Sequence, residues 1–203
     1  MTVSTTESGH HGRSGSGPEW EYLLRTWRGL DVPQGWRAEI DDGRIALLPP
    51  PRGGHHIIVE SLQRRLCQCL PEDLGIYQRL STAFPALGKL FVPHLMVVPC
   101  DIVLGPGHER DDPVDAAEAL LVVEITSKSN ARHDRTKKLW AYAHAPVPLY
   151  LLVDRYDERG PMVTLFSDPQ NGTYKHADAT PFGRPLTLPE PFHATLPTEK
   201  FPH

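Results

Sequence analysis

The fold is decided by residues 120–154, "LLVVEITSKSNARHDRTKKLWAYAHAPVPLYLLVD". The run "ALLVVEI" at 119–125 is apolar on both faces, which is typical of a central strand that is covered from both sides. The segment 130–145 predicts a helix that Pro146 ends, and the apolar run at 148–154 predicts a further strand. A helix that crosses between two strands indicates a mixed sheet with helices packed on it, the architecture of an α/β domain.

The rest of the chain extends this pattern on both sides. Residues 1–17 hold Ser, Thr, Gly and His with almost nothing to bury, so we expect a disordered tail followed by a single domain at 18–203. Asp42 and Gly43 lie between two β-prone arms, which predicts an amino-terminal β-hairpin. The other predicted elements are helices at 19–30 and 55–70, strands near 75–82 and 90–98, a loop at 105–116, and a hairpin that pairs 148–154 with 162–167.

Composition excludes several classes of protein. The 203 residues suffice for one domain with a sizeable core, and the net charge of −4 does not match the broadly basic surface of a non-specific nucleic-acid binder. Cys67, Cys69 and Cys100 indicate no disulfide framework, and we interpret them as buried, unreactive thiols. No run approaches the ~20 apolar residues of a membrane span, and the first residues lack the apolar core of a signal peptide. We therefore expect a reduced, cytoplasmic protein.

Glu124 is the strongest single signal for a functional site. A carboxylate at the end of a buried strand is unfavourable unless a cation, a hydrogen-bond donor or water meets it. On the next helix, Asp134, Lys138 and Tyr142 follow one another at steps of four, so they share one face. A structural interpretation stays open beside this one: Glu124 then caps a loop in solvent, and the three helix residues form a solvated ladder with Tyr142 against the sheet.

These residues carry a resemblance to a known family. Residues 120–154 are similar to the Uma-type family of putative restriction endonucleases, a branch of the PD-(D/E)XK nuclease superfamily. In that family an apolar strand ends in Glu, and a Ser-rich turn, a helix with Asp, Lys and Tyr, and a strand ending in Val-Asp follow. The matching positions are Glu124, Ser127, Asp134, Lys138, Tyr142, Val147, Pro148, Tyr150, Val153 and Asp154. The resemblance covers residues 20–195 and implies a restriction-endonuclease-like core, with a mixed central sheet flanked by helices and an amino-terminal β-hairpin.

The resemblance also implies hydrolysis of DNA phosphodiesters that depends on a divalent metal, Mg²⁺ or Mn²⁺. Glu124 would be a metal ligand, and Lys138 would orient the attacking water and offset the charge that builds on the phosphate. Lys128 and Lys137 remain rivals of Lys138 for this role, and Thr126 stands where the superfamily's plainest motif has its lysine. The candidate catalytic residues are Glu124, Lys138, Asp134, Tyr142 and Glu39.

A further departure lies in "FVPHLMVVPCDIVL", residues 91–104, where the family has a Pro-Asp pair followed by apolar residues. His94 takes the place of the acid in that register. Asp101 is the alternative acid, but it lies beyond Pro99, and strict alternation puts it on the opposite face from His94. Mg²⁺ prefers oxygen ligands whereas imidazole suits softer transition metals, so His94 indicates an impaired nuclease, a compensating acid or a softer metal. A histidine held in the core is the structural alternative.

Two acids are candidates to compensate for His94. Glu39 lies on the first hairpin, where the family also carries a glutamate, and Glu60 lies on the first helix one turn after His56. The predicted metal ligands are His94, Glu124 and Glu60. Either His55 or His56 matches a histidine at the start of the family's first helix, and the sequence leaves that choice open. An exposed strand residue and a helix surface charge are the structural alternatives for the two acids.

Three functions from different classes follow from these residues. The favoured one is a metal-dependent endonuclease that acts on DNA and is impaired by His94. The others are a catalytically degenerate domain that serves in binding or regulation, and an enzyme that uses a transition metal on a small-molecule substrate. Dimers are common among related nucleases because two sites are needed to cut both strands, so a homodimer is expected by analogy, and no membrane partner is expected.

Overall fold

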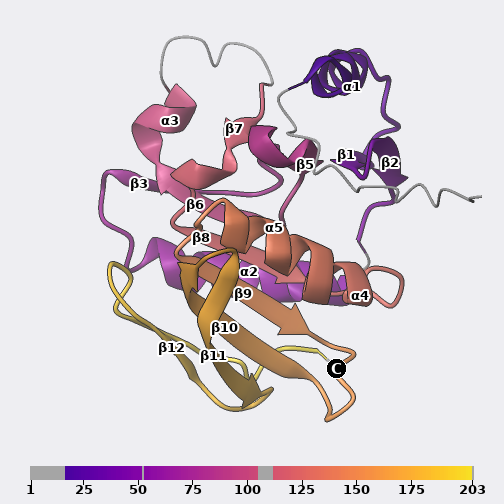
Figure 1. The fold of residues 1–203 in the computed structure, drawn as a ribbon. Coiled ribbons are helices and arrows are strands. Elements are labelled where there is room, and N and C mark those ends of the chain that lie inside the picture. Colours follow the sequence, from indigo (N-terminus) through magenta and orange to yellow (C-terminus); the bar gives the residue numbers. More distant parts are fainter. Residues whose placement is uncertain (1–16, 52, 105–111, 203) are drawn as a thin grey trace, which may run out of the picture.

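The computed structural model describes residues 17–51, 53–104 and 112–202, and Figure 1 shows the arrangement of their elements. Residues 1–16, which make up most of the predicted tail, and residues 105–111 of the predicted loop lie outside the described residues. The helices are α1 (Pro18–Arg28), α2 (Gly53–Cys67), α3 (Cys100–Leu104), α4 (Ala131–His133) and α5 (Leu139–His144), with 3-10 turns at Pro85–Leu87 and Ala116–Glu118. None of the helices in the described part of the chain has the length and apolar character that a membrane span needs.

The main sheet has six strands in the order β11-β10-β9-β8-β6-β3. Its strands are β3 (Leu74–Tyr77), β6 (Leu95–Pro99), β8 (Leu121–Ile125), β9 (Leu149–Asp154), β10 (Met162–Gln170) and β11 (Thr173–Pro181). Strands β8 and β9 are parallel, and each of the other neighbouring pairs is antiparallel. The predicted mixed sheet is therefore confirmed, with β8 among its central strands.

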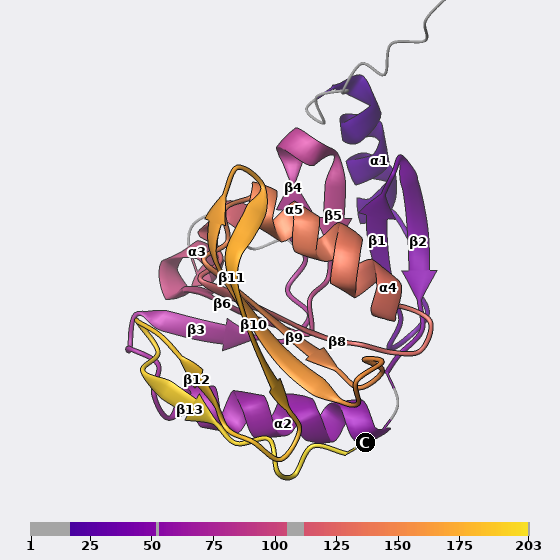
Figure 2. The same cartoon turned by 60° about the horizontal axis from the view of Figure 1, so that its bottom comes forward.

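Other elements cover both faces of this sheet, as expected for a central strand that is apolar on both sides. Val123 and Ile125 of β8 pack in the core cluster that includes α2 and the end of the chain, whereas Val122 packs in the cluster that includes Tyr142 of α5. The end of the chain forms a small sheet of β12 (Leu186–Leu188) and β13 (Ala194–Leu196). Alternation along β8 therefore points Glu124 toward α4 and α5, which Figure 2 shows on the side of the sheet away from α2.

A second sheet of five strands, in the order β2-β1-β5-β4-β7, lies beside the main sheet. Its strands are β1 (Arg37–Asp41), β2 (Arg44–Leu48), β4 (Thr82–Phe84), β5 (Lys89–Phe91) and β7 (Val114–Asp115). Trp20 of α1 packs against Ile40 and Leu90 in the core of this sheet. The predicted hairpin is formed by β1 and β2, and Asp42 and Gly43 adopt the left-handed conformation that its tight turn requires.

The predicted helix between β8 and β9 contains a π-helical turn at Asp134–Lys138, which joins α4 to α5. Such turns are rare and recur at functional sites. Asp134 and Lys138 stand at the two ends of the turn, and both are buried. One helix thus directs two titratable side chains into the interior of the protein.

The prediction of a single strand at 90–98 was wrong, because this segment is divided between the two sheets. Strand β5 ends before Val92, and β6 begins after His94. Pro93 has no backbone N–H to donate to a neighbouring strand, which explains the break at this point. His94 therefore lies in the connection between the two sheets and not within a strand.

Further features differ from expectation. The strand β11 and the pair β12 and β13 were not predicted. The three cysteines are free, but the expectation that they are buried was wrong, because Cys67 is exposed and Cys69 and Cys100 are partly exposed.

Candidate active site

A cluster of charged and polar side chains lies where the two sheets meet the helix between β8 and β9. It comprises Arg37 and Glu39 of β1, His94 of the connection between the sheets, Glu124 of β8, and Asp134 and Lys138 of the π-helical turn. Glu124 and Lys138 are fully buried, with 0% of each residue exposed. Four segments of the chain thus bring titratable side chains together in the interior.

Lys138 is at the centre of the cluster. Its Nζ donates to Oε1 of Glu124 at 2.8 Å and to Oε1 of Glu39 at 3.0 Å, and it lies 3.9 Å from Oδ1 of Asp134. Burial alone would lower the pKa of Lys138, but the carboxylates of Glu124 and Glu39 raise it, so the ammonium group stays charged. Burial alone would raise the pKa of Glu124, but Lys138 and His94 hold it well below its usual range. Glu124 and Lys138 therefore form a charged pair that is closed off from solvent.

His94 lies beside the second carboxylate oxygen of Glu124. Its Nδ1 lies 2.5 Å from Oε2 of Glu124 and 3.2 Å from the backbone N of Ile125, while Nη1 of Arg37 lies 3.2 Å from Nε2. Arg37 faces Nε2 as a donor and the backbone N–H of Ile125 donates to Nδ1, so each ring nitrogen meets a donor, and Oε2 of Glu124 has no hydrogen-bond partner among the described residues. Burial lowers the pKa of His94, so the ring is neutral at pH 7. The two polar groups that the sequence analysis placed at one site thus contact each other directly.

Arg37 belongs to the cluster and was not predicted. Its Nη1 also donates to the carbonyl oxygen of Val92 at 3.2 Å, and its Nε lies 3.8 Å from Oε1 of Glu39. The sequence did hold a signal for it, because residues two apart on a strand share a face and Glu39 was already a candidate. Arg37 adds a second positive charge beside the two carboxylates.

Asp134 and Tyr142 are buried on the same helix, and their side-chain oxygens have no hydrogen-bond partner among the described residues. Burial raises the pKa of Asp134 to about 8, although Lys138 acts in the opposite direction, so the acid is mainly neutral at pH 7. Burial also raises the pKa of Tyr142 well above its ordinary value. The ring of Tyr142 packs against that of Phe84 with centroids 5.1 Å apart, so this residue is part of the apolar core beside the cluster.

The structure distinguishes the two histidines at the start of α2. The ring centroid of His55 lies 4.4 Å from that of His94, and neither ring nitrogen of His55 has a hydrogen-bond partner in the described part of the chain. Burial, and next the neighbouring His94, lower the pKa of His55 to about 3. His56 is exposed and lines a surface pocket together with Glu60. His55, and not His56, therefore borders the cluster.

Several residues of the predicted site lie away from the cluster. The side chain of Glu60 is 56% exposed and pairs with Arg64 on the surface of α2, so the structure does not bring this predicted metal ligand to Glu124. Lys128 is exposed, and the side chain of Lys137 is 49% exposed. Asp101 is exposed on α3. Lys138 is thus the lysine that meets Glu124, and His94, not Asp101, is the one of these two residues that lies beside it.

Thr126 belongs to a different network, at the ends of β8 and β9. Its Oγ1 donates to Oδ1 of Asp154 at 3.0 Å. The Nε and Nη2 of Arg135 donate to the two oxygens of the same carboxylate at 2.5 and 2.9 Å. This network joins the two parallel strands to the helix and has no contact with Glu124 among those described, so Thr126 does not act as a substitute for a catalytic lysine.

The charges of the cluster balance without a bound cation. Two cations face two carboxylates, and the remaining titratable members, Asp134 and His94, are neutral at pH 7. Mg²⁺ takes oxygen ligands at about 2.0–2.1 Å, but the side-chain nitrogens of Lys138 and His94 lie 2.8 and 2.5 Å from the two oxygens of Glu124. Within the described ranges, no group of three or more His, Cys, Asp and Glu side chains is arranged to hold a metal ion. The residues as arranged therefore do not fit the Mg²⁺ site that the resemblance implied.

Fold and cluster together define a class of protein. A mixed sheet is flanked by helices, and Glu124 of a central strand accepts from Lys138 of the following helix. The chain belongs to the Uma2 family, whose model, described as "Putative restriction endonuclease", matches residues 20–199. Nucleases of this class generally use divalent metals. The family resemblance that was read from residues 120–154 is therefore confirmed.

A solved structure shows the same fold. The chain is similar to a crystal structure described as a putative nuclease belonging to DUF820 from Anabaena variabilis ATCC 29413. The two chains superpose with a TM-score of 0.64 and have 19% sequence identity. The match covers 84% of this chain and 90% of the other. At this identity the likeness shows the fold alone, and it confirms the predicted restriction-endonuclease-like core. None of the curated proteins matched the chain.

Proposed function

We propose that the protein is a restriction-endonuclease-like nuclease that acts on DNA and whose Mg²⁺-dependent cleavage is impaired by His94. One observation carries the proposal. Inside a closed cluster, Oε1 of Glu124 accepts from Lys138 at 2.8 Å and Oε2 faces Nδ1 of His94 at 2.5 Å. A metal-dependent hydrolase needs carboxylate oxygens that are open to the ion, and here the side-chain nitrogens of Lys138 and His94 lie within 2.8 Å of the two oxygens of Glu124.

His94 is the residue that closes the site. An aspartate at this position would put a second negative charge beside Glu124, and two adjacent carboxylates repel unless a cation or a proton lies between them. The neutral imidazole instead lies 2.5 Å from Oε2 of Glu124 and adds no negative charge. Histidine at position 94 therefore removes both an oxygen ligand and the charge that would draw Mg²⁺ into the cluster.

The other charged side chains of the cluster support a site that is built for the cleavage of phosphodiesters. Burying charged groups does not by itself favour folding, because apolar side chains of similar volume often stabilise a core as well or better. Lys138 is nevertheless fully buried beside Glu124 and Glu39. A lysine next to carboxylates is what cleavage of a phosphodiester requires, because it offsets the charge that develops on the phosphate.

Nicking of a supercoiled plasmid tests the proposal, since one site cuts one strand and no dimer is needed. His94→Asp is expected to raise the nicking rate in Mg²⁺ at least tenfold over the wild type, because groups that stabilise developing charge contribute roughly 10²–10³-fold. His94→Asn is the matched control, with similar size and no charge, and it should leave the rate unchanged. Adding Glu124→Gln to His94→Asp should remove the gain.

Other outcomes would change the assignment. A well-folded His94→Asp variant without any gain would show that the register or the activity is misassigned. Mg²⁺-dependent nicking by the wild type that Glu124→Gln abolishes would show that His94 does not impair the site. The degenerate alternative predicts that all variants bind DNA and none cleaves it. Repeating the assay in Mn²⁺, with metal analysis of the purified protein, tests the softer metal that a histidine ligand would favour.

A further inference from the structure

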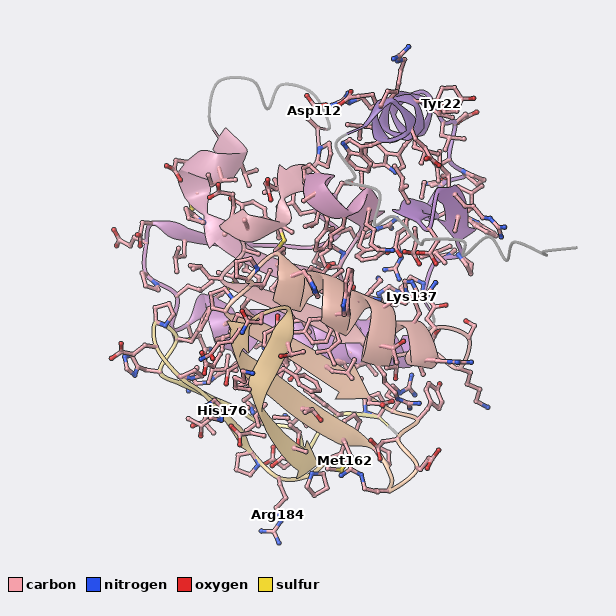
Figure 3. All side chains as sticks on the ribbon, viewed as in Figure 1. Tyr22, Asp112, Lys137, Met162, His176 and Arg184 are labelled. Carbon is pink, nitrogen blue, oxygen red and sulfur yellow. The ribbon has the colours of Figure 1, made fainter. Side chains whose placement is uncertain are left out.

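A cavity of about 890 Å³ opens beside α1, between β1 and the segments around Ser81 and Val92. This volume lies in the range of sites that enclose a small molecule, roughly 300–1,000 Å³. The side chains that decide its chemistry are Trp27, Trp36, Arg28, Arg37, Arg79 and Asp112. Figure 3 shows Asp112 beside α1, at the rim of this region. The cavity thus combines aromatic rings with a group of arginines.

Three arginines line the cavity although the chain carries a net charge of −4. Asp112 is the one acid of its described lining, and it pairs with Nε of Arg28 at 2.9 Å. Nη2 of Arg79 donates to the carbonyl oxygen of Trp36 at 2.6 Å, which orients the guanidinium group without neutralising it. Arg79 has a φ of 56°, in the left-handed region that non-glycine residues seldom adopt. Guanidinium groups held in this way favour a phosphate or another planar anion.

The two tryptophans supply surfaces on which a base can stack. Trp27 is fixed by a hydrogen bond from its Nε1 to the carbonyl oxygen of Ala38 at 2.9 Å. Trp36 remains 38% exposed, so much of its ring is open to solvent. Every nucleobase has an aromatic face, so stacking on such rings binds unpaired nucleotides with little regard to sequence. An acidic peptide would use the arginines but would leave the exposed indole without a partner.

Arg37 joins the cavity to the buried cluster. It lines the cavity, and its Nη1 also lies 3.2 Å from Nε2 of His94. A phosphate that binds in the cavity can therefore reach the same guanidinium group that holds His94. The cavity therefore meets the candidate active site at Arg37.

We propose that this cavity binds one unpaired nucleotide of a DNA strand, with its base on Trp36 and its phosphate on Arg79 and Arg37. The inference rests on the proposed function in one respect, that the substrate is DNA, and it adds that a single-stranded segment is what the protein recognises. The cavity, at about 890 Å³, has room for a nucleotide, whereas a paired base would have its edge and both faces occupied by its own duplex.

Fluorescence anisotropy of a labelled oligo(dT) strand tests this site, in EDTA and at one fixed salt concentration. Trp36→Ala and Arg79→Ala are each expected to weaken binding about tenfold, because stacking and phosphate contacts each contribute at this scale. Trp140→Ala is the matched control, since Trp140 is 44% exposed on α5 and does not line the cavity. Arg159→Ala, on an exposed arginine that pairs with Asp157, controls for loss of a positive charge. Duplex of the same length should bind more weakly than the single strand.

Unchanged binding of oligo(dT) by well-folded Trp36→Ala and Arg79→Ala would overturn the proposal, as would equal losses in the two control variants. Tighter binding of the duplex than of the single strand would also overturn it. Circular dichroism and urea unfolding establish that each variant is folded. Because EDTA excludes cleavage, this result does not depend on whether His94→Asp gains nuclease activity, so the two proposals fail separately.

Discussion

Lys137 and Lys138 are neighbours in the sequence and make the same kind of contact in opposite surroundings. Nζ of Lys137 lies 2.5 Å from Oδ2 of Asp42 and 3.3 Å from Oδ2 of Asp41, at the tip of the β1–β2 hairpin. Nζ of Lys138 lies 2.8 Å from Glu124 and 3.0 Å from Glu39. The side chain of Lys137 is 49% exposed and that of Lys138 is 0% exposed. Both lysines join the same helix to the same hairpin, and Figure 3 shows Lys137 on the side of the helix that faces it.

The difference shows what burial does to an ion pair. Water screens the pair of Lys137, so its carboxylate partners are stable with or without the lysine. Lys89 and His133 also bind Asp41 at the hairpin tip, so the loss of one partner leaves others in place. Lys138 has no such substitute, because only Arg37 is a further cation near Glu124 and Glu39 among the described contacts. The buried pair is therefore the sensitive one, and it is also the pair that belongs to the candidate active site.

The largest expected effect is that of removing the buried cation. Lys138→Met should lower the free energy of unfolding by about 3–5 kcal/mol, because it leaves two carboxylates unpaired in the interior. Lys137→Met, the matched control, should change it by at most about 1 kcal/mol. Urea unfolding of the two variants at pH 7 measures the contrast. Equal losses of stability in both would show that burial does not separate the two lysines.

A smaller effect is expected at Asp134, and it should depend on pH. The pKa of Asp134 is raised from 3.8 to about 8 in the folded protein, so the native state holds a proton that the unfolded chain releases. Its contribution to stability is complete below the unfolded pKa and is lost as the pH rises toward 8, by at most about 1.4 kcal/mol per pH unit. Asp134→Asn removes this dependence. The variant should therefore gain stability relative to the wild type between pH 5 and pH 8.

Urea unfolding of the wild type and Asp134→Asn across this pH range checks the prediction. Lys137→Met again serves as a control, because it should follow the pH dependence of the wild type. A constant difference between Asp134→Asn and the wild type from pH 5 to pH 8 would mean that Asp134 is ionised in the folded protein. The neutral charge assigned to the cluster would then be wrong.

Much of the fold and part of the cluster could be predicted from the sequence, because local patterns specify them. An apolar strand that ends in Glu124 and a helix with residues four apart were enough to bring Asp134 and Lys138 to one side of the sheet. The choice between Lys137 and Lys138 needed the structure. The two differ by one residue, and only the phase of the helix, with its π-helical turn, decides which of them is buried.

The rest depended on contacts between distant segments. Arg37 enters the cluster from a hairpin far away in sequence, and its role becomes visible only once β1 lies beside the connection that carries His94. Glu60 was expected at the site and instead faces solvent, because α2 turns its apolar stripe to the sheet and leaves this residue outside. The choice between His55 and His56 likewise depended on which face of α2 is buried.

The most direct test of the account is the effect of Mg²⁺ on the melting temperature of the wild type, His94→Asp and His94→Asn. A ligand that binds the folded state raises the melting temperature, so the shift reports binding without any need for activity. The wild type should melt at the same temperature in millimolar Mg²⁺ as in EDTA, because Lys138 and His94 lie against the two oxygens of Glu124, and His94→Asn should behave likewise, because asparagine adds no negative charge. His94→Asp should melt below the wild type in EDTA and recover in Mg²⁺. A Mg²⁺-dependent rise in the wild type that Glu124→Gln abolishes would contradict the account.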